Sequence, residues 1–307
     1  MITTHARHQQ WGELEIADAH VHFFSPAFYQ SLAEQKAVTG VGPLLGWDIP
    51  ESAEALSDRW VVELDRNSVD SAVLIASIPG DVESVGVAVE RHPSRFRSVV
   101  MVNPMHPGVD MRCASALAAG QINGIFLFPA MHRYSLHDDH VRSLLALVSG
   151  YPGAVVYVHC GMLSVGFRKK LGLPSPFDMR YSNPIDLHEL ALSFHRLPFI
   201  VPHFGAGYFR EALMLADLCP NVYFDTSSSN SWMRTDPAGL SLAGVYSKAL
   251  EVLGPKRLLF GTDSSWFPRG WMRSVFDTHV QALADAGVSP ETARGIFAGN
   301  LKTLFKT

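Results

Sequence analysis

The stretch D-A-H-V-H-F, residues 18–23, ends the first apolar run of the sequence and decides how the rest is interpreted. If Leu14 to His22 forms a strand, Asp18, His20 and His22 share one face, because strand side chains alternate with a period of two. The roots of the two imidazoles are then about 7 Å apart, close enough to bind one metal ion. The sequence contains 14 histidines, however, so this pair alone is more readily explained as an accident of composition.

Strand patterns and helix patterns alternate from this stretch to the end of the chain. Short apolar runs predict eight strands, at residues 14–22, 72–76, 96–102, 122–128, 154–159, 199–203, 222–225 and 257–263. Helical patterns follow them, at 52–67, 81–91, 109–119, 137–148, 183–195, 207–218, 236–253, 271–286 and from 289 onward. Parallel neighbours need such crossover helices. Eight units in 307 residues predict a single-domain α/β fold, the (β/α)8 TIM barrel, over residues 1–307.

An open doubly wound sheet is the alternative, but no Gly-rich turn follows the first strand. Long segments without a sustained period follow strands one and five, at 23–50 and 160–182, and are expected to border the active-site end of the barrel. The net charge of −4 contains no long basic run, which argues against nucleic acid. No window approaches eighteen apolar residues, no signal peptide is visible, and the three cysteines form no framework, so a cytoplasmic protein is expected.

The carboxyl ends of the predicted strands carry the polar residues from which this barrel builds its active sites. They include four histidines and two aspartates: His20, His22, His159, His203, Asp225 and Asp263. Scattered histidines would show no such bias toward strand ends, so a functional site is favoured. Imidazole nitrogens with one or two carboxylates suit zinc, manganese or iron(II). Three histidines and one aspartate leave an open position, which a catalytic metal needs.

Seven motifs, in order and spacing, extend the argument over nearly the whole chain. They are D-A-H-V-H-F (18–23), G-I-F-L-F-P-A (124–130), V-Y-V-H-C-G (156–161), V-P-H-F-G (201–205), N-V-Y-F-D-T-S (221–227), L-L-F-G-T-D-S (258–264) and I-F-A-G-N-L-K-T-L-F (296–305). The sequence with these motifs resembles the amidohydrolase-related family often called amidohydrolase 2. That family includes metal-dependent hydrolases, lactonases and aminocarboxymuconate-semialdehyde-type decarboxylases.

The resemblance implies a ligand set of His20, His22 and His159 with Asp263 as the fourth ligand. It also implies that His203 works beside the metal as an acid/base or polarising group, and that Asp263 handles a proton. The expected cofactor is therefore one divalent metal ion, zinc in the first place, with manganese or iron as alternatives.

The fourth strand departs from the family pattern. Relatives commonly carry a lysine and a histidine where this sequence has Phe126 and Phe128. In related amidohydrolases a carbamylated lysine from this strand bridges two metals. Its replacement by phenylalanine predicts one metal ion rather than two.

Further residues are expected to support the site. Asp18 is interpreted as a hydrogen-bonding support rather than a ligand, and Asp225 either orients His203 or caps a loop. Seven cations fall in the predicted rim loops: Arg133, Arg168, Lys169, Lys170, Arg180, Arg234 and Arg269. The substrate contacts selected from the rim are two arginines and two tryptophans, Arg168, Arg180, Trp232 and Trp266.

Three functions are compatible with these residues. The leading hypothesis is a metal-dependent hydrolase that cleaves an ester, lactone or amide of a small organic acid with a metal-activated water. In it His203 stabilises the oxyanion and Asp263 relays the proton. The alternative is a metal-dependent decarboxylase of an unsaturated or aromatic acid, and the third is a non-catalytic barrel that binds a small ligand. The expected partner is a small-molecule substrate, carboxylated or not, with no nucleic acid or membrane; self-association into a homo-oligomer stays open.

Overall fold

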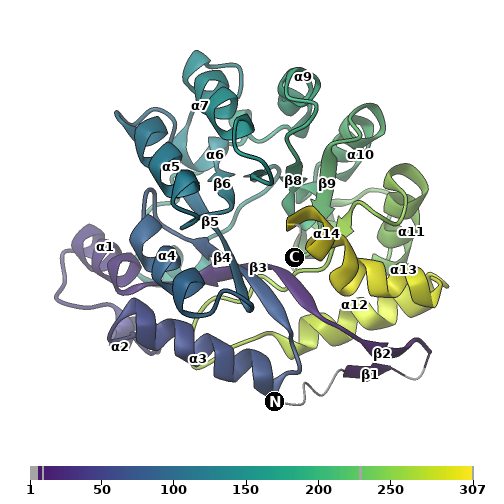
Figure 1. The fold of residues 1–307 in the computed structure, drawn as a ribbon, viewed down its shortest axis with the longest axis horizontal. Coiled ribbons are helices and arrows are strands. Elements are labelled where there is room, and N and C mark those ends of the chain that lie inside the picture. Colours follow the sequence, from purple (N-terminus) through teal and green to yellow (C-terminus); the bar gives the residue numbers. More distant parts are fainter. Residues whose placement is uncertain (1–5, 9, 228–229, 306–307) are drawn as a thin grey trace.

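Eight parallel strands surrounded by helices form the body of the protein (Figure 1). The computed structural model describes residues 6–8, 10–227 and 230–305. Neighbouring strands pair in sequence order from β3 to β10. Their bounds are β3 Ala17–Phe23, β4 Ser71–Ala76, β5 Phe96–Val102, β6 Gly124–Leu127, β7 Val155–Val158, β8 Phe199–Val201, β9 Val222–Asp225 and β10 Leu258–Leu259. The predicted TIM barrel is confirmed.

The barrel closes between its first and last strands through backbone hydrogen bonds. His22 N–H donates to the carbonyl of Ser264 over 2.7 Å, and Asp263 N–H donates to the carbonyl of His20 over 3.0 Å. A parallel bridge between Val21 and Ser264 lies at the same place. The closure therefore holds the strand that carries two histidines against the segment that carries Asp263.

The carboxylate of Asp18 reinforces this closure from within. It is fully buried and accepts hydrogen bonds from the His20 N–H (2.9 Å), the Thr262 N–H (3.1 Å) and hydroxyl (2.5 Å), and the Trp271 indole N–H (2.7 Å). Burial raises the pKa of Asp18 to about 6, although these donors favour the charged form. The hydrogen bonds of Asp18 thus join β3 to the segment that follows β10.

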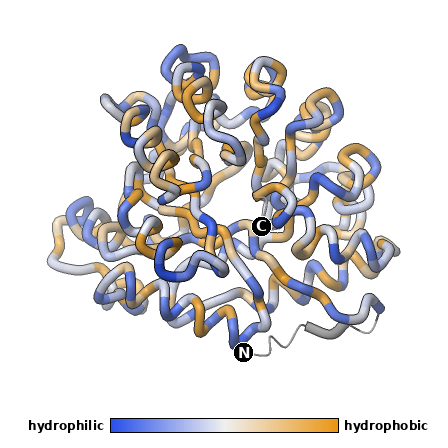
Figure 2. Tube along the Cα trace, viewed as in Figure 1, coloured by the Kyte–Doolittle hydropathy of each residue, from blue (hydrophilic) through white to orange (hydrophobic). Residues whose placement is uncertain are grey.

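Amphipathic helices cover the outside of the barrel, and in Figure 2 apolar and hydrophilic residues alternate along them. The main ones are α3 Ala53–Arg66, α4 Val82–Arg91, α5 Val109–Ala118, α7 Asp139–Ser149, α10 Phe209–Leu218, α11 Leu242–Leu253 and α12 Arg273–Asp285. Shorter ones are α9 His188–Ser193, α13 Pro290–Arg294 and α14 Asn300–Phe305. Within the described residues, none of the helices is both long and apolar enough to cross a membrane.

Three predicted elements differ from the structure. The first strand begins at Ala17, because Gly12–Leu14 (β2) pairs instead with Ala6–His8 (β1) in a separate hairpin. The helix expected from residue 236 begins at Leu242, since Asp236 accepts hydrogen bonds from following backbone N–H groups and forms a turn. Segment 23–50 contains two helices, α1 Pro26–Lys36 and α2 Gly42–Leu45, of which the first is capped by the Ser25 hydroxyl.

The segments after β3 and β7 pack on each other over the barrel mouth. Phe24 stacks on Phe28 with ring centroids 3.9 Å apart, and both contact Phe167 of the short helix α8, Gly166–Lys170. Trp47 also meets Phe167, at 5.6 Å. The two long insertions therefore form one aromatic wall above the strand ends, at the end of the barrel that the sequence predicted them to border.

Candidate metal centre

A cavity of about 750 Å³ lies at the carboxyl ends of the strands. It is lined by the five residues predicted to bind or flank the metal: His20, His22, His159, His203 and Asp263. They come from the ends of β3, β7, β8 and β10, which are far apart in sequence and meet only in the closed barrel. The remaining lining is largely aromatic and aliphatic, which suits a small organic molecule.

Hydrogen bonding fixes which nitrogen of His20 faces the cavity. Its Nδ1 lies 2.5 Å from Oδ2 of Asp225, and both side chains are buried. Burial disfavours a charged carboxylate, yet the adjacent His20 holds the pKa of Asp225 below its ordinary value. An ionised carboxylate only accepts, so Nδ1 donates and, in the neutral ring, Nε2 keeps its lone pair. The pairing of a ligand histidine with a carboxylate is the usual support of a metal site.

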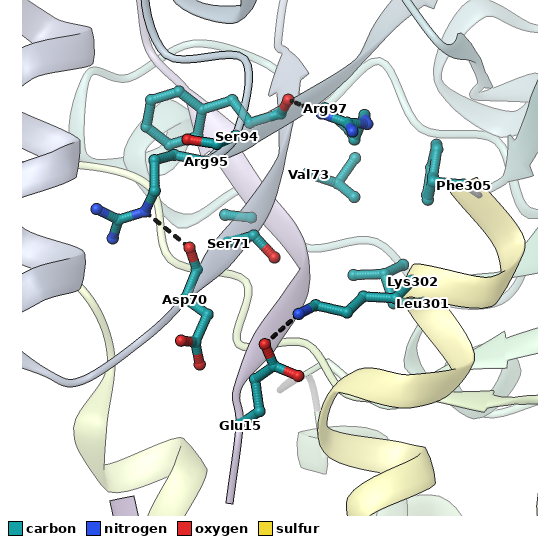
Figure 3. Close-up of a pocket in the computed structure, with 12 residues that line it drawn as sticks. Glu15, Asp70, Ser71, Val73, Ser94, Arg95, Arg97, Leu301, Lys302 and Phe305 are labelled. Atoms are coloured by element: carbon teal, nitrogen blue, oxygen red, sulfur yellow. Dashed lines mark hydrogen bonds and ion pairs between the residues drawn. The ribbon is translucent and has the colours of Figure 1, made fainter. Parts of the chain in front are cut away.

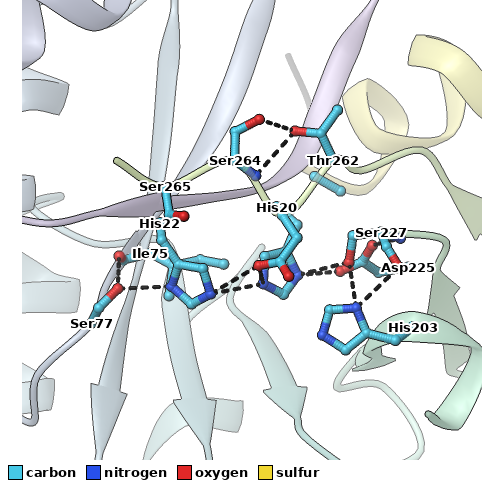
Figure 4. A network of polar contacts seen from close by, with 12 residues as sticks. His20, His22, Ile75, Ser77, His203, Asp225, Ser227, Thr262, Ser264 and Ser265 are labelled. Atoms are coloured by element: carbon cyan, nitrogen blue, oxygen red, sulfur yellow. Dashed lines mark hydrogen bonds and ion pairs between the residues drawn. The ribbon is translucent and has the colours of Figure 1, made fainter. Parts of the chain in front are cut away.

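The hydroxyl of Ser77 fixes which nitrogen of His22 faces the cavity (Figure 4). The Ser77 hydroxyl donates to the carbonyl of Ile75 over 3.0 Å, so it accepts from Nδ1 of His22 over 2.8 Å. Nε2 of His22 is therefore also left with a lone pair. Sequence reasoning missed the role of Ser77, although it stands at the end of the second predicted strand.

The two Nε2 atoms face each other at 3.4 Å, and neither carries a hydrogen in these tautomers. Oδ1 of Asp263 lies 3.2 Å from Nε2 of His22 and 3.7 Å from Nε2 of His20. Among the described residues, His20, His22 and Asp263 are the group of metal-binding type whose donor atoms all lie within 4.8 Å of one another. Two imidazole nitrogens and a carboxylate oxygen this close together form a donor set of the kind that holds a divalent metal.

His159 borders this group from the opposite wall. Its ring stacks on Phe128, with centroids 5.3 Å apart, and lies 5.4 Å from the ring of His203. Its Nε2 is buried and has no hydrogen-bond partner among the described residues. Burial holds the pKa of His159 well below its ordinary value, so the ring is neutral. A buried, neutral and unpartnered imidazole suits a further ligand.

His203 follows β8 in an unusual backbone conformation, with φ at 57° and ψ at 31°. Its Nδ1 lies 3.1 Å from the carbonyl of Ser227 and 2.9 Å from the Ser227 hydroxyl. A carbonyl only accepts, so Nδ1 carries the hydrogen and Nε2 is an acceptor. Burial, with the nearby His20, lowers the pKa of His203, which keeps the ring neutral.

Asp225 serves His20 rather than His203, which corrects half of the sequence interpretation. Its second oxygen, Oδ1, accepts a 2.7 Å hydrogen bond from the Ser227 N–H, so the expected loop cap is present. The backbone of Ser227 orients His203 in its place. Pairs such as Asp225 and His20 cannot be read from a strand pattern, because they depend on how the barrel closes.

The end of β6 is apolar, as its sequence indicated. Phe126 meets His20 edge to face at a centroid distance of 5.8 Å and packs on Phe128 at 4.2 Å. Tyr157 fills the space beside it, with its hydroxyl donating to the carbonyl of Ala19 over 2.9 Å. This wall of the cavity is therefore formed by aromatic side chains where relatives carry a lysine. The replacement supports the expectation of a single metal.

The substrate contacts expected at the rim divide into two groups. Trp232 and Trp266 line the cavity. Arg168 and Arg180 do not line it: the first donates to Gln35 and the carbonyl of Pro174, and the second to Asp178. Three of the other rim cations, which were not selected as substrate contacts, line the cavity instead: Lys170, Arg234 and Arg269.

A second cavity, of about 460 Å³, lies at the opposite end of the barrel (Figure 3). It is bordered by the starts of β4 and β5 and by α14. Arg95 donates to the carbonyl of Asp70 over 2.7 Å, and Lys302 pairs with Glu15. It contains none of the histidines, and residues at this end of a TIM barrel serve stability rather than catalysis.

Replacing Asp225 by asparagine is expected to weaken metal binding roughly 10- to 100-fold, as loss of an outer-shell partner usually does. Asparagine keeps the shape but removes the charge that fixes the Nδ1–H tautomer of His20. Competition with a chromogenic chelator measures the affinity. Asp186→Asn, a half-buried carboxylate outside the cavity lining, is the matched control. Equal affinities of parent and Asp225→Asn would contradict the pairing.

Comparisons with known proteins show which chains this one resembles. Protein fluG of Emericella nidulans is 32% identical over 167 residues, which cover 50% of this chain and 18% of fluG, so the chain spans less than a fifth of that relative. The 5-carboxyvanillate decarboxylase LigW2 from Novosphingobium aromaticivorans, solved with manganese and 3-methoxy-4-hydroxy-5-nitrobenzoic acid, superposes with a TM-score of 0.62 at 16% identity, covering 100% of this chain and 98% of that one. A probable 2-pyrone-4,6-dicarboxylic acid hydrolase from Acinetobacter baumannii, with citric acid bound, gives 0.61 at 14% identity, covering 96% and 100%.

At these identities the solved structures establish likeness of fold only. The amidohydrolase family model, by contrast, matches the sequence itself from residue 3 to residue 306. This match spans every strand of the barrel and all the histidines of the cavity. The chain belongs to the amidohydrolase family, whose members are metal-dependent enzymes.

Proposed function

We propose that the protein is a metal-dependent hydrolase that cleaves an ester, lactone or amide bond in a small organic acid. The observation that carries this proposal is the pair of Nε2 lone pairs of His20 and His22, which face each other at 3.4 Å beside Asp263. In the proposal, His20, His22, His159 and Asp263 hold one divalent ion, and nitrogen-rich donors of this kind suit zinc first, then manganese or iron. A cation in this position supplies Lewis acidity, which polarises a carbonyl and acidifies a water molecule.

His203 is suited to accept a proton. Its Nδ1–H is held by the Ser227 carbonyl, so Nε2 is the atom available in the cavity, and the lowered pKa keeps it unprotonated. We therefore assign His203 the role of general base toward the attacking water. This differs from the oxyanion-stabilising role expected from the sequence, which needs a hydrogen on Nε2.

Asp263 stays ionised beside these histidines. Burial opposes its charge, but the imidazoles of His22, His20 and His203 around it hold its pKa well below the ordinary value. Its carboxylate can therefore accept a hydrogen bond from water or from an imidazolium and orient it. In the proposal it passes the proton from His203 to the leaving group.

Decarboxylation of an aromatic acid is the second candidate. It is favoured by the aromatic rings of Phe128, Trp232 and Trp266 in the cavity, since an apolar surrounding destabilises a carboxylate relative to carbon dioxide. LigW2, of the same fold, is such a decarboxylase.

Product analysis separates the two reactions. The metal-loaded protein is incubated with a panel of lactones, aryl esters and amides, and in parallel with aromatic and unsaturated acids. Hydrolysis is expected, seen as the carboxylic acid product by chromatography, with no carbon dioxide in the headspace. Carbon dioxide from the acids, with no turnover of the first panel, would replace the hydrolase by the decarboxylase.

A further inference from the structure

The charged side chains that line the cavity are mostly positive. Asp263 is the one carboxylate among the described lining residues, and it belongs to the proposed ligand set. Three cations, Lys170, Arg234 and Arg269, line the same cavity. A bound metal would add further positive charge. The cavity is therefore suited to an anion and not to a cation.

Arg269 is the best ordered of these three cations. Its Cζ lies 4.9 Å from the centroid of the Trp266 ring, and its Nη2 donates to the Ser265 hydroxyl over 2.7 Å. The Asp263 carbonyl lies 3.4 Å from the same nitrogen. No described residue accepts a hydrogen bond from Nε or Nη1. The guanidinium is thus fixed in position while two of its nitrogens can still donate to a ligand.

The other two cations lack this support within the described part of the chain. Arg234 donates to the carbonyl of Ser231 at 3.3 Å, and no aromatic ring lies beneath its guanidinium. Lys170 ends the exposed helix α8 and presents a flexible ammonium. Ordering a side chain in advance lowers the entropy lost on binding, so Arg269 should contribute most to affinity.

A continuous wall of planar groups joins Arg269 to the metal centre. His22 meets Phe24 at 5.7 Å, Phe24 stacks on Trp47 at 5.8 Å, and Trp47 stacks on Trp266 at 4.9 Å with an interplanar angle of 11°. Arg269 lies on the last of these rings. A flat substrate placed along this wall has one end at the histidines and a neighbouring part at the guanidinium.

We propose that Arg269 is a specificity-determining residue that binds a carboxylate of a planar substrate lying along the Phe24–Trp47–Trp266 wall. The inference rests on the proposed function for the other end of the substrate, where the reacting carbonyl meets the metal centre. Charge-assisted hydrogen bonds from a fixed guanidinium are stronger than neutral ones, so the carboxylate should be selected over an uncharged group of the same shape.

The test compares benzoate with benzamide, a neutral probe of nearly the same shape, by isothermal titration of the metal-loaded full-length protein. The parent is expected to prefer benzoate. Arg269→Gln should reduce the ratio of the two affinities roughly 10- to 100-fold, because a hydrogen bond to a charged group is lost. Arg269→Lys, which keeps the charge without the planar group, should lie in between. The metal contributes equally to the affinity ratio of each variant, so a change in that ratio reports the substitution alone. Metal analysis checks that each variant is loaded.

Arg273→Gln is the matched control, since it removes the same charge from an exposed arginine that pairs with Asp277 and does not line the cavity. It should behave as the parent. An unchanged ratio in Arg269→Gln, or an equal fall in Arg234→Gln, would overturn the assignment, as would a parent without preference for benzoate. These outcomes would contradict the role of Arg269 without contradicting the proposed hydrolase function. Turnover by the chelated protein, by contrast, would contradict the metal-dependent hydrolase without changing the measured preference for benzoate.

Discussion

The His20→Ala variant is expected to bind less than a tenth of an equivalent of metal, and to lose about 1,000-fold or more in kcat/KM, because a catalytic metal supplies several kcal/mol of transition-state stabilisation. His20 lies at the centre of the site. Its Nε2 faces both His22 and Asp263, and its Nδ1 is bonded to Asp225. Alanine removes the donor and also leaves the buried Asp225 carboxylate without its main partner.

Elemental analysis after dialysis measures the metal content, and thermal melting checks that the variant is folded. His140→Ala is the matched control, because His140 is exposed and pairs only with Asp138. Chelation of the parent should reproduce the loss of activity, and added zinc or manganese should reverse it. Full activity in the chelated parent or in His20→Ala would contradict a metal-dependent reaction.

The His203→Asn variant is expected to keep its metal but to lose about 100- to 10,000-fold in kcat, the range that general acid–base groups contribute. Asparagine is the suitable replacement because residue 203 has a φ of 57°, a conformation that asparagine tolerates better than most residues. The loss then reports the missing Nε2 rather than a strained backbone.

His203→Gly extends this experiment, since glycine also accepts a positive φ and leaves room for free imidazole. Added imidazole should restore part of the activity of this variant and none of that of His203→Asn. His279→Gln is the control for altering a buried histidine, because His279 is fully buried, bonds to Tyr246 and lies outside the cavity lining. A kcat of His203→Asn equal to that of the parent would contradict the proposed general-base role of His203.

The positions of the strands could be predicted from the sequence because buried parallel strands are short, apolar and separated by helices of clear period. Polar residues at most of the strand ends followed directly, so His20, His22, His159, His203 and Asp263 could be named before any contact was known. These residues do line one cavity. The alternation of strands and helices in the sequence therefore predicts which residues lie at one rim of the barrel.

The contacts between those residues were beyond the sequence for a physical reason. Asp225 and His20 stand 205 positions apart, and their 2.5 Å contact depends on strand tilt and closure rather than on local pattern. Helix α1 was missed because its helical spacing of buried residues is confined to one short stretch, Phe28 to Ala33, inside an otherwise aperiodic segment. The chosen rim arginines, Arg168 and Arg180, have partners of their own, and only the folded loops distinguish them from Arg269.

The seam between β3 and β10 gives the metal a thermodynamic role besides its chemical one. The proposed ligands His20 and Asp263 stand near the two ends of the chain, on either side of that seam. An ion held by both is a reversible cross-link that exists only when the first and last strands have met. By mass action, a free concentration 1,000 times the dissociation constant would stabilise the closed barrel by about 4 kcal/mol. The supply of the cation in the cell would then control how much of the protein is folded, as well as how fast it works.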